Sequence, residues 1–150
     1  MPQMPDAKQG PVRAYELPLI GRDERGQTLV IPNRRSGDFM LGFRKAASSS
    51  GRHYHSGLRE HKNPEILILI SGRAELRWRY LEESELHVLN LEGPVRLEVD
   101  AGIWHELYAL SDLVFWEMNS LQDVQADSIR IEYGEPGPGL PGGSAPNTEL

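Results

Sequence analysis

The chain has 150 residues, a net charge of −6 and no cysteine. This length fits one domain with its own core, and the lack of cysteine excludes disulfides, thiolate metal sites and cysteine nucleophiles. The acidic balance without a basic stripe argues against nucleic-acid binding. The N-terminal residues lack a signal-peptide apolar segment, and the longest apolar run, residues 66–70, is too short to span a bilayer. We therefore expect a cytoplasmic protein that binds neither nucleic acid nor membrane.

The two ends of the chain differ in composition from its middle. Residues 1–12 are polar and contain three prolines, which predicts a flexible N-terminal segment. Residues 134–150 consist largely of glycine and proline. Such a segment cannot bury enough apolar surface to offset its ordering entropy, so it predicts a disordered tail. One domain is expected between them, over residues 13–133.

Short strands separated by turn residues fill the middle of the chain. Residues 74–80 alternate between apolar and polar side chains, which is typical of a strand with one buried face. In chain order, strands are predicted at residues 39–43, 65–70, 74–80, 86–91, 95–99, 103–110, 113–118 and 129–133. Only residues 121–128 suit a helical turn. This spacing predicts an all-β sandwich or small barrel.

Histidine and glutamate side chains are placed where they can meet inside such a barrel. His53 and His55 are two residues apart, so on a strand their rings share one face. Glu65 begins the most apolar strand, where a carboxylate needs a partner. His105 lies on a predicted inward face. Together they could bind a divalent metal. Alternatively, His105 is a core histidine bonded to a backbone carbonyl, and Glu65 pairs with Lys62.

These positions resemble the two sequence motifs of the cupin superfamily. Residues 51–55, Gly-Arg-His-Tyr-His, followed by Glu65 and then by Gly72 after six residues, resemble the first motif. Gly102 and His105 resemble the second motif. The resemblance implies a small double-stranded β-helix, the jelly-roll cupin barrel, and a homodimer. It also implies that His53, His55, Glu65 and His105 bind Fe, Mn, Ni, Cu or Zn.

The chain also departs from these motifs. Nine residues separate His55 from Glu65, where the superfamily usually has three or four. The extra loop, residues 56–64, is expected to fold outward or over the pocket mouth. A second alignment, with His61 in place of His55, remains open. In the second motif, Asp100 replaces the usual proline and Ala109 the usual asparagine.

A narrower resemblance is to the nucleotide-sugar 3,5-epimerases and 3,4-ketoisomerases. It rests on residues 23–26, Asp-Glu-Arg-Gly, and on residues 105–112, His-Glu-Leu-Tyr-Ala-Leu-Ser-Asp. These enzymes work without metal, and the resemblance implies that His53 is a general base. Imidazole suits that role because its pKa lies near working pH. However, the epimerases carry a lysine at the place of Glu65 and a general-acid tyrosine on the strand after Asp112, where this chain offers Trp116 and Met118.

Three functional hypotheses follow from the sequence. The first is a metal-dependent cupin that acts on or binds a small polar metabolite, since three histidines and one glutamate leave open coordination positions. The second is a metal-free sugar-nucleotide isomerase or epimerase, with His53 as base and His55 and His105 against the substrate. The third is a non-catalytic ligand-binding cupin. The candidate substrate contacts are Arg25, for a phosphate, His61, Lys62 and Tyr108.

Overall fold

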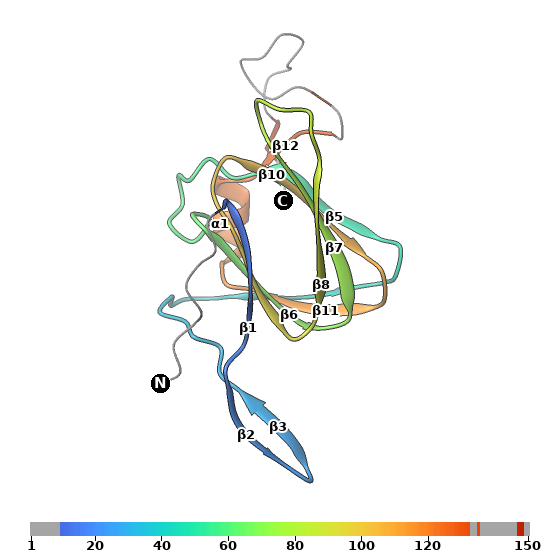
Figure 1. Cartoon of the computed structure of the whole chain (residues 1–150). Helices are drawn as coiled ribbons and strands as arrows, with labels where there is room; N and C mark the ends of the chain where they lie inside the picture. The colour runs from blue at the N-terminus through green and yellow to red at the C-terminus, as the bar shows by residue number, and fades with distance from the viewer. Residues whose placement is uncertain (1–9, 133–134, 136–146, 149–150) are drawn as a thin grey trace.

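The structure is a computed structural model that describes residues 10–132, 135 and 147–148. Two antiparallel sheets enclose the interior of a barrel, and a separate two-stranded hairpin extends away from it (Figure 1). The five-stranded sheet has the order β1-β9-β6-β11-β4, and the six-stranded sheet has the order β13-β12-β5-β10-β7-β8. The predicted all-β jelly-roll barrel is confirmed.

The strand bounds agree closely with most of the predicted ranges. The five-stranded sheet contains β1 (Val12–Glu16), β4 (Met40–Arg44), β6 (Glu65–Ser71), β9 (Val95–Val99) and β11 (Leu113–Glu117). The six-stranded sheet contains β5 (Ser49–Tyr54), β7 (Arg73–Tyr80), β8 (His87–Glu92), β10 (Ile103–Ala109), β12 (Ile129–Arg130) and β13 (Asn147–Thr148). The hairpin is formed by β2 (Leu19–Asp23) and β3 (Gly26–Leu29).

The apolar run in β6 is buried on both faces of its sheet. Leu67 and Leu69 point into the barrel and belong to the main core cluster. Ile66 and Ile68 point outward and pack against Leu17 and Met118. Because a strand places alternate residues on opposite faces, a strand buried on both sides needs a continuous apolar sequence. This explains why the run does not alternate like that of β7.

The helical turn expected at residues 121–128 is α1 (Leu121–Ala126). Ser120 caps its N-terminus: the serine hydroxyl accepts from the backbone N–H of Asp123, whose carboxylate accepts from the backbone N–H of Ser120. This reciprocal pair satisfies two donors that a helix start would otherwise leave unpaired. The cap fixes α1 beside the end of β11, at the end of the barrel where the site lies.

The predicted terminal segments lie mostly outside the described residues. Residues 1–9 of the predicted N-terminal segment are not among them, and Val12 already belongs to β1. Of the predicted tail, residues 135 and 147–148 are described, and β13 pairs with β12. No helix in the described part of the chain is both long and apolar enough to cross a bilayer.

Candidate active site

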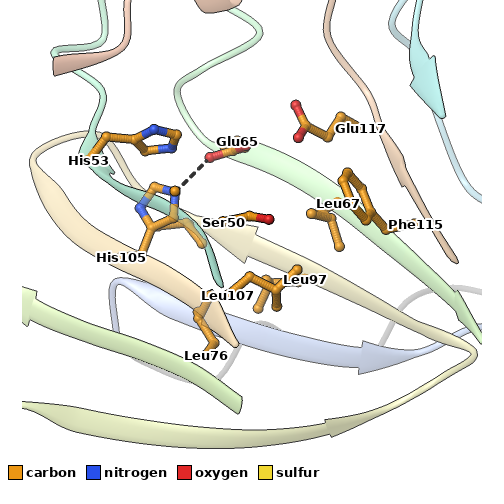
Figure 2. Close-up of a pocket in the computed structure, with 12 residues that line it drawn as sticks. Ser50, His53, Glu65, Leu67, Leu76, Leu97, His105, Leu107, Phe115 and Glu117 are labelled. Atoms are coloured by element: carbon orange, nitrogen blue, oxygen red, sulfur yellow. Dashed lines mark ion pairs between the residues drawn. The ribbon is translucent and has the colours of Figure 1, made fainter. Parts of the chain in front are cut away.

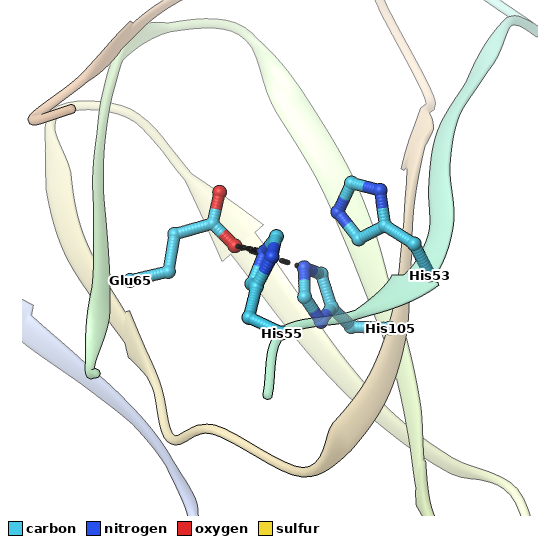
Figure 3. Close-up of side chains that lie close together, drawn as sticks. All are labelled: His53, His55, Glu65 and His105. Carbon is cyan, nitrogen blue, oxygen red and sulfur yellow. Dashed lines mark hydrogen bonds and ion pairs between the residues drawn. The ribbon is translucent and has the colours of Figure 1, made fainter. Parts of the chain in front are cut away.

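Four side chains from three segments meet inside the barrel near one end (Figure 3). His53 is in β5, His55 follows that strand directly, Glu65 begins β6 and His105 lies in β10. The ring centroids of His53 and His105 are 4.8 Å apart, and those of His53 and His55 are 4.6 Å apart. The structure therefore brings together the four residues that the sequence analysis selected.

A β-bulge in β5 directs His53 into the barrel. Gly51 and Arg52 have φ angles of +92° and +60°, and the pairing of β5 with β10 shifts register between His105 and Glu106. A bulge re-aims the side chains that follow it, so Ser50 and His53 both line the interior although they are three residues apart. Glycine suits position 51 because its φ is positive and a Cβ would lie 3.0 Å from the His105 carbonyl oxygen.

The hydrogen bonds of His55 and His105 define where protons must sit. His55 Nδ1 lies 2.6 Å from the carbonyl oxygen of Asp127, and His105 Nδ1 lies 3.0 Å from that of Ile103. A carbonyl oxygen only accepts, so both Nδ1 atoms donate. Both Nε2 atoms also approach Glu65 Oε2, at 2.6 and 3.0 Å. Glu65 Oε2 and the two Nε2 atoms must therefore share at least one further proton.

Glu65 is the anionic centre of this cluster. Burial alone would raise its pKa, but the charges of Lys62 and His55 and the hydrogen bonds from His105 and His55 outweigh that effect and hold the pKa well below its usual range. The shared protons accordingly reside on imidazole nitrogens. The result is a buried arrangement in which a carboxylate binds two imidazoles, one of which, His105, lines the pocket.

The loop at residues 56–64 is held at both ends and is largely exposed: Leu58 is 76% exposed, whereas Lys62 is buried at the pocket. Asp127, which is 1% exposed, accepts hydrogen bonds from the backbone N–H groups of Ser56, Gly57 and Arg59. At the other end of the loop, the Arg35 guanidinium donates to the carbonyl oxygens of His61 and Pro64. These two clamps hold the loop between them against the barrel.

The clamped loop places Lys62 at the pocket. Its side chain is 1% exposed, and its Nζ lies 3.5 Å from Glu65 Oε1 and 3.9 Å from Glu117 Oε2. At these separations the ammonium group neutralises both carboxylates without a short hydrogen bond to either. Lys62 also lines the outer part of the pocket, so the candidate substrate contact does reach the site.

The pocket has an apolar floor and a polar upper part (Figure 2). Its inner part, of about 50 Å³, is bounded by leucines from both sheets, and its polar side chains are Ser50, His53, Glu65, His105 and Glu117. The outer part, of about 260 Å³, opens between β4, β5 and α1 and includes Arg44 and Lys62. His53 and Glu117 line both parts. The combined space suits a small polar ligand.

Glu117 is a pocket residue that the sequence analysis missed. That analysis compared Trp116 and Met118 with the tyrosine of the epimerases, but the inward residue of β11 at this level is Glu117, two positions after the buried Phe115. Burial and then the negative charge of Glu65 raise the pKa of Glu117. The positive charge of Lys62 is the largest of the effects that lower it. Because alternate residues of a strand share a face, an inward Phe115 would have predicted an inward Glu117.

The other predicted substrate contacts lie away from the pocket. Arg25 is in the exposed turn of the β2–β3 hairpin and pairs with Asp23 at 2.6 Å. Tyr108 is on the outer face of β10, where the Arg77 guanidinium lies 4.4 Å from its ring centre. Tyr108 is three residues after His105 on the same strand, and an odd spacing places two side chains on opposite faces of a strand.

His61 points outside the barrel. Its Nδ1 lies 3.5 Å from Asp123 Oδ2, beside α1. His55, in contrast, is fully buried against Glu65. The alignment that places His55 in the histidine pair therefore matches the observed cluster, and the alternative with His61 does not.

Comparisons with known proteins identify the fold. No protein-family model and no curated protein matches the chain. Among solved structures, a doubly substituted QdtA 3,4-ketoisomerase from Thermoanaerobacterium thermosaccharolyticum, in complex with TDP, is 19% identical, with a TM-score of 0.64 over 83% of this chain and 90% of that one. The epimerase RmlC from Legionella pneumophila, in complex with dTDP-4-keto-L-rhamnose, is 14% identical, with a TM-score of 0.63 over 87% of this chain and 78% of that one.

A third similar structure is NovW, a 4-keto-6-deoxy sugar epimerase from Streptomyces spheroides, at 13% identity and a TM-score of 0.68 over 90% of this chain and 77% of that one. At these identities the likeness establishes the fold. The chain has the barrel fold of these epimerases and ketoisomerases, the enzymes of the narrower resemblance.

The prediction of a divalent metal cofactor is wrong. The neighbouring epimerases and ketoisomerases act without a metal. His55 Nε2 and Glu65 Oε2 are 2.6 Å apart. Of the four residues expected to bind a metal, His55 and His105 instead pair with Glu65.

Proposed function

We propose that the protein is a metal-free isomerase or epimerase of a nucleotide-linked keto sugar, with His53 as the general base. The observation that carries this proposal is the position of His53: its imidazole lines both parts of a pocket that also contains the proton-holding pair of His105 and Glu65. The fold adds support, since similar structures were solved with TDP, dTDP-4-keto-L-rhamnose or TDP-4-keto-6-deoxyglucose.

The chemistry requires a base beside a carbon that neighbours a carbonyl group. An imidazole is effective because it gains and loses a proton near neutral pH. His53 would remove the proton from that carbon, and the electrons of the broken C–H bond would form an enolate with the carbonyl. For the ketoisomer, the neighbouring hydroxyl gives its proton to the enolate oxygen, its own oxygen becomes the new carbonyl, and the former carbonyl carbon takes a proton. Protonation of the original carbon from its other face gives the epimer.

His105 and His55 have different roles in this proposal. His105 lines the pocket and carries an Nε2 proton that it shares with Glu65, so it is placed to polarise a substrate carbonyl. His55 is 0% exposed and is bonded at both ring nitrogens. It is therefore a positioning residue that holds the Glu65 carboxylate rather than a substrate contact.

Arg44 is the arginine that lines the pocket mouth, and it replaces Arg25 as the candidate contact for a diphosphate. Its Nε donates to Ser50 Oγ at 2.6 Å, and its guanidinium carbon lies 4.9 Å from the Phe115 ring centre. These contacts orient a planar group that can bind two phosphate oxygens at once.

The proposal is tested by incubating the protein with TDP-4-keto-6-deoxyglucose and following the sugar by proton NMR. We expect turnover by the wild type and its loss, by about 10²-fold or more, in His53→Asn. His87→Asn is the matched control, since His87 stacks on Trp78 at 4.2 Å and is not among the residues that line the pocket. Equal rates in the two variants would refute the role of His53.

A further inference from the structure

We propose that Glu117 and Lys62 form the second half of the reaction site. Glu117 delivers a proton to the face of the substrate carbon opposite His53, and Lys62 stabilises the enolate oxygen. This inference rests on the proposed function and makes it more specific, because two proton-transfer groups on opposite sides of a substrate produce an epimer. In the epimerases that the sequence resembles, the lysine stands at the place of Glu65, and the general-acid tyrosine stands on the strand after Asp112.

The two sheets place His53 and Glu117 on opposite walls of the pocket. His53 belongs to β5 in the six-stranded sheet, and Glu117 belongs to β11 in the five-stranded sheet. Both line the inner and the outer part of the pocket, and Figure 2 shows Glu117 across the cavity from His53. A ligand in this space therefore has an imidazole on one side and a carboxyl group on the other.

Glu117 is suited to hold a proton in this position. Its side chain is 19% exposed, while the Glu65 carboxylate is 7% exposed and bonded to two imidazoles. Burial and the negative charge of Glu65 both raise the pKa of Glu117. Of the two carboxyl groups in the pocket, Glu117 is thus the better suited to hold a proton, and Glu65 is bonded to two imidazoles; paired carboxyl groups in active sites typically divide their roles in this way.

Lys62 introduces a positive charge where the enolate oxygen would form. Its Nζ lies between the two carboxylates, 3.5 Å from Glu65 Oε1 and 3.9 Å from Glu117 Oε2. The clamps on the loop by Asp127 and Arg35 fix this position before any ligand binds. A fixed cation in a site with little water stabilises developing negative charge strongly, since no solvent has to reorganise.

The proposed epimerisation consists of two proton transfers, one on each face of the substrate carbon. His53 takes the proton from the carbon beside the carbonyl, the C–H electron pair forms a carbon–carbon double bond, and the carbonyl π electrons move to the oxygen beside Lys62. The carbonyl then re-forms as the double bond takes a proton from the Glu117 carboxyl group on the other face. His53 is left protonated and Glu117 ionised, and water restores both. The reaction is redox-neutral and needs no co-reactant.

Solvent exchange in D₂O tests the inference with Glu117→Gln, which preserves size and removes the proton donor. We expect the variant to exchange the sugar C–H for deuterium within about threefold of the wild-type rate, while formation of the inverted product falls by about 10²-fold or more. Glu92→Gln, on the exposed side of β8, is the matched control. Product formation by Glu117→Gln at the wild-type rate would overturn the inference, as would an equal loss of exchange and product.

A second variant, Lys62→Met, separates catalysis from structure. We expect both exchange and product formation to fall by about 10²–10³-fold, with TDP affinity within about threefold of wild type. Unchanged turnover by a folded Lys62→Met protein would overturn the role of Lys62. Absence of exchange in the wild type would instead refute the proposed function, so the two failures are distinguishable.

Discussion

Asp127→Asn is predicted to destabilise the protein by about 3–6 kcal/mol. The Asp127 carboxylate accepts four hydrogen bonds: Ser56 N and Oγ donate to Oδ1 at 2.7 and 2.6 Å, and Gly57 N and Arg59 N donate to Oδ2 at 3.0 Å each. Asparagine keeps one acceptor oxygen and turns its amide group toward two donors. Because a hydrogen bond to a charged group is worth about 1.5–3 kcal/mol, losing two of them gives this magnitude.

Chemical unfolding in urea at pH 7 measures this loss directly, and the thermal midpoint should fall by about 10 °C. The exposed Asp38 provides the matched control, since Asp38→Asn makes the same chemical change and should alter the free energy of unfolding by less than about 0.5 kcal/mol. If Asp127→Asn unfolded at the wild-type urea concentration, the clamp on the loop would contribute nothing and the reasoning would be refuted.

The same carboxylate predicts a pH dependence. Burial would raise the pKa of Asp127, but the hydrogen bonds from Ser56 and Arg59 outweigh it and lower the pKa. A carboxyl group with a lowered pKa in the folded state stabilises the protein above its unfolded pKa of about 3.9, and that contribution is lost as pH falls through the folded value. The difference between wild type and Asp127→Asn should therefore shrink below about pH 4. A constant difference from pH 7 to pH 3 would contradict this assignment.

Three further predictions concern the pocket and the assembly. Gly42→Ala should destabilise the protein by about 1–3 kcal/mol in thermal unfolding, because a Cβ at Gly42 would lie 2.2 Å from the Phe115 ring; an unchanged midpoint would show that the ring moves at no cost. Arg44→Gln should weaken TDP binding by about tenfold in calorimetry, and an unchanged affinity would exclude Arg44 as a phosphate contact. The predicted homodimer remains a prediction, and light scattering should give the mass of two chains rather than one.

The barrel could be predicted from the sequence because most strands carry a simple pattern. Alternation in β7 and the apolar run of β6 each point to a strand, and the turn residues between strands mark their ends. The β2–β3 hairpin was not predicted, since its five residues in β2 are all exposed and leave no alternation to read. The bulge in β5 could not be predicted from the sequence either, because it depends on the positive φ angles of Gly51 and Arg52.

The cluster of His53, His55, Glu65 and His105 was predicted from the sequence, whereas Glu117 was missed and the leading hypothesis of a metal was wrong. The spacing of His53 and His55 brought two imidazoles to one face, and Glu65 and His105 joined them. Whether such residues bind a metal or pair with one another is not specified by their spacing in the sequence. The position of Lys62 depends on how its loop closes, and that closure needs Asp127, more than sixty residues away in the chain.

The most direct test of the account is deuterium incorporation into TDP-4-keto-6-deoxyglucose by protein that has been dialysed against a strong chelator. We predict that the chelated wild type exchanges the C–H beside the carbonyl at the same rate as untreated protein, and that chelated His53→Asn does not exchange it. Loss of exchange on chelation, with recovery on adding a divalent metal, would contradict the central claim, as would exchange by His53→Asn at the wild-type rate.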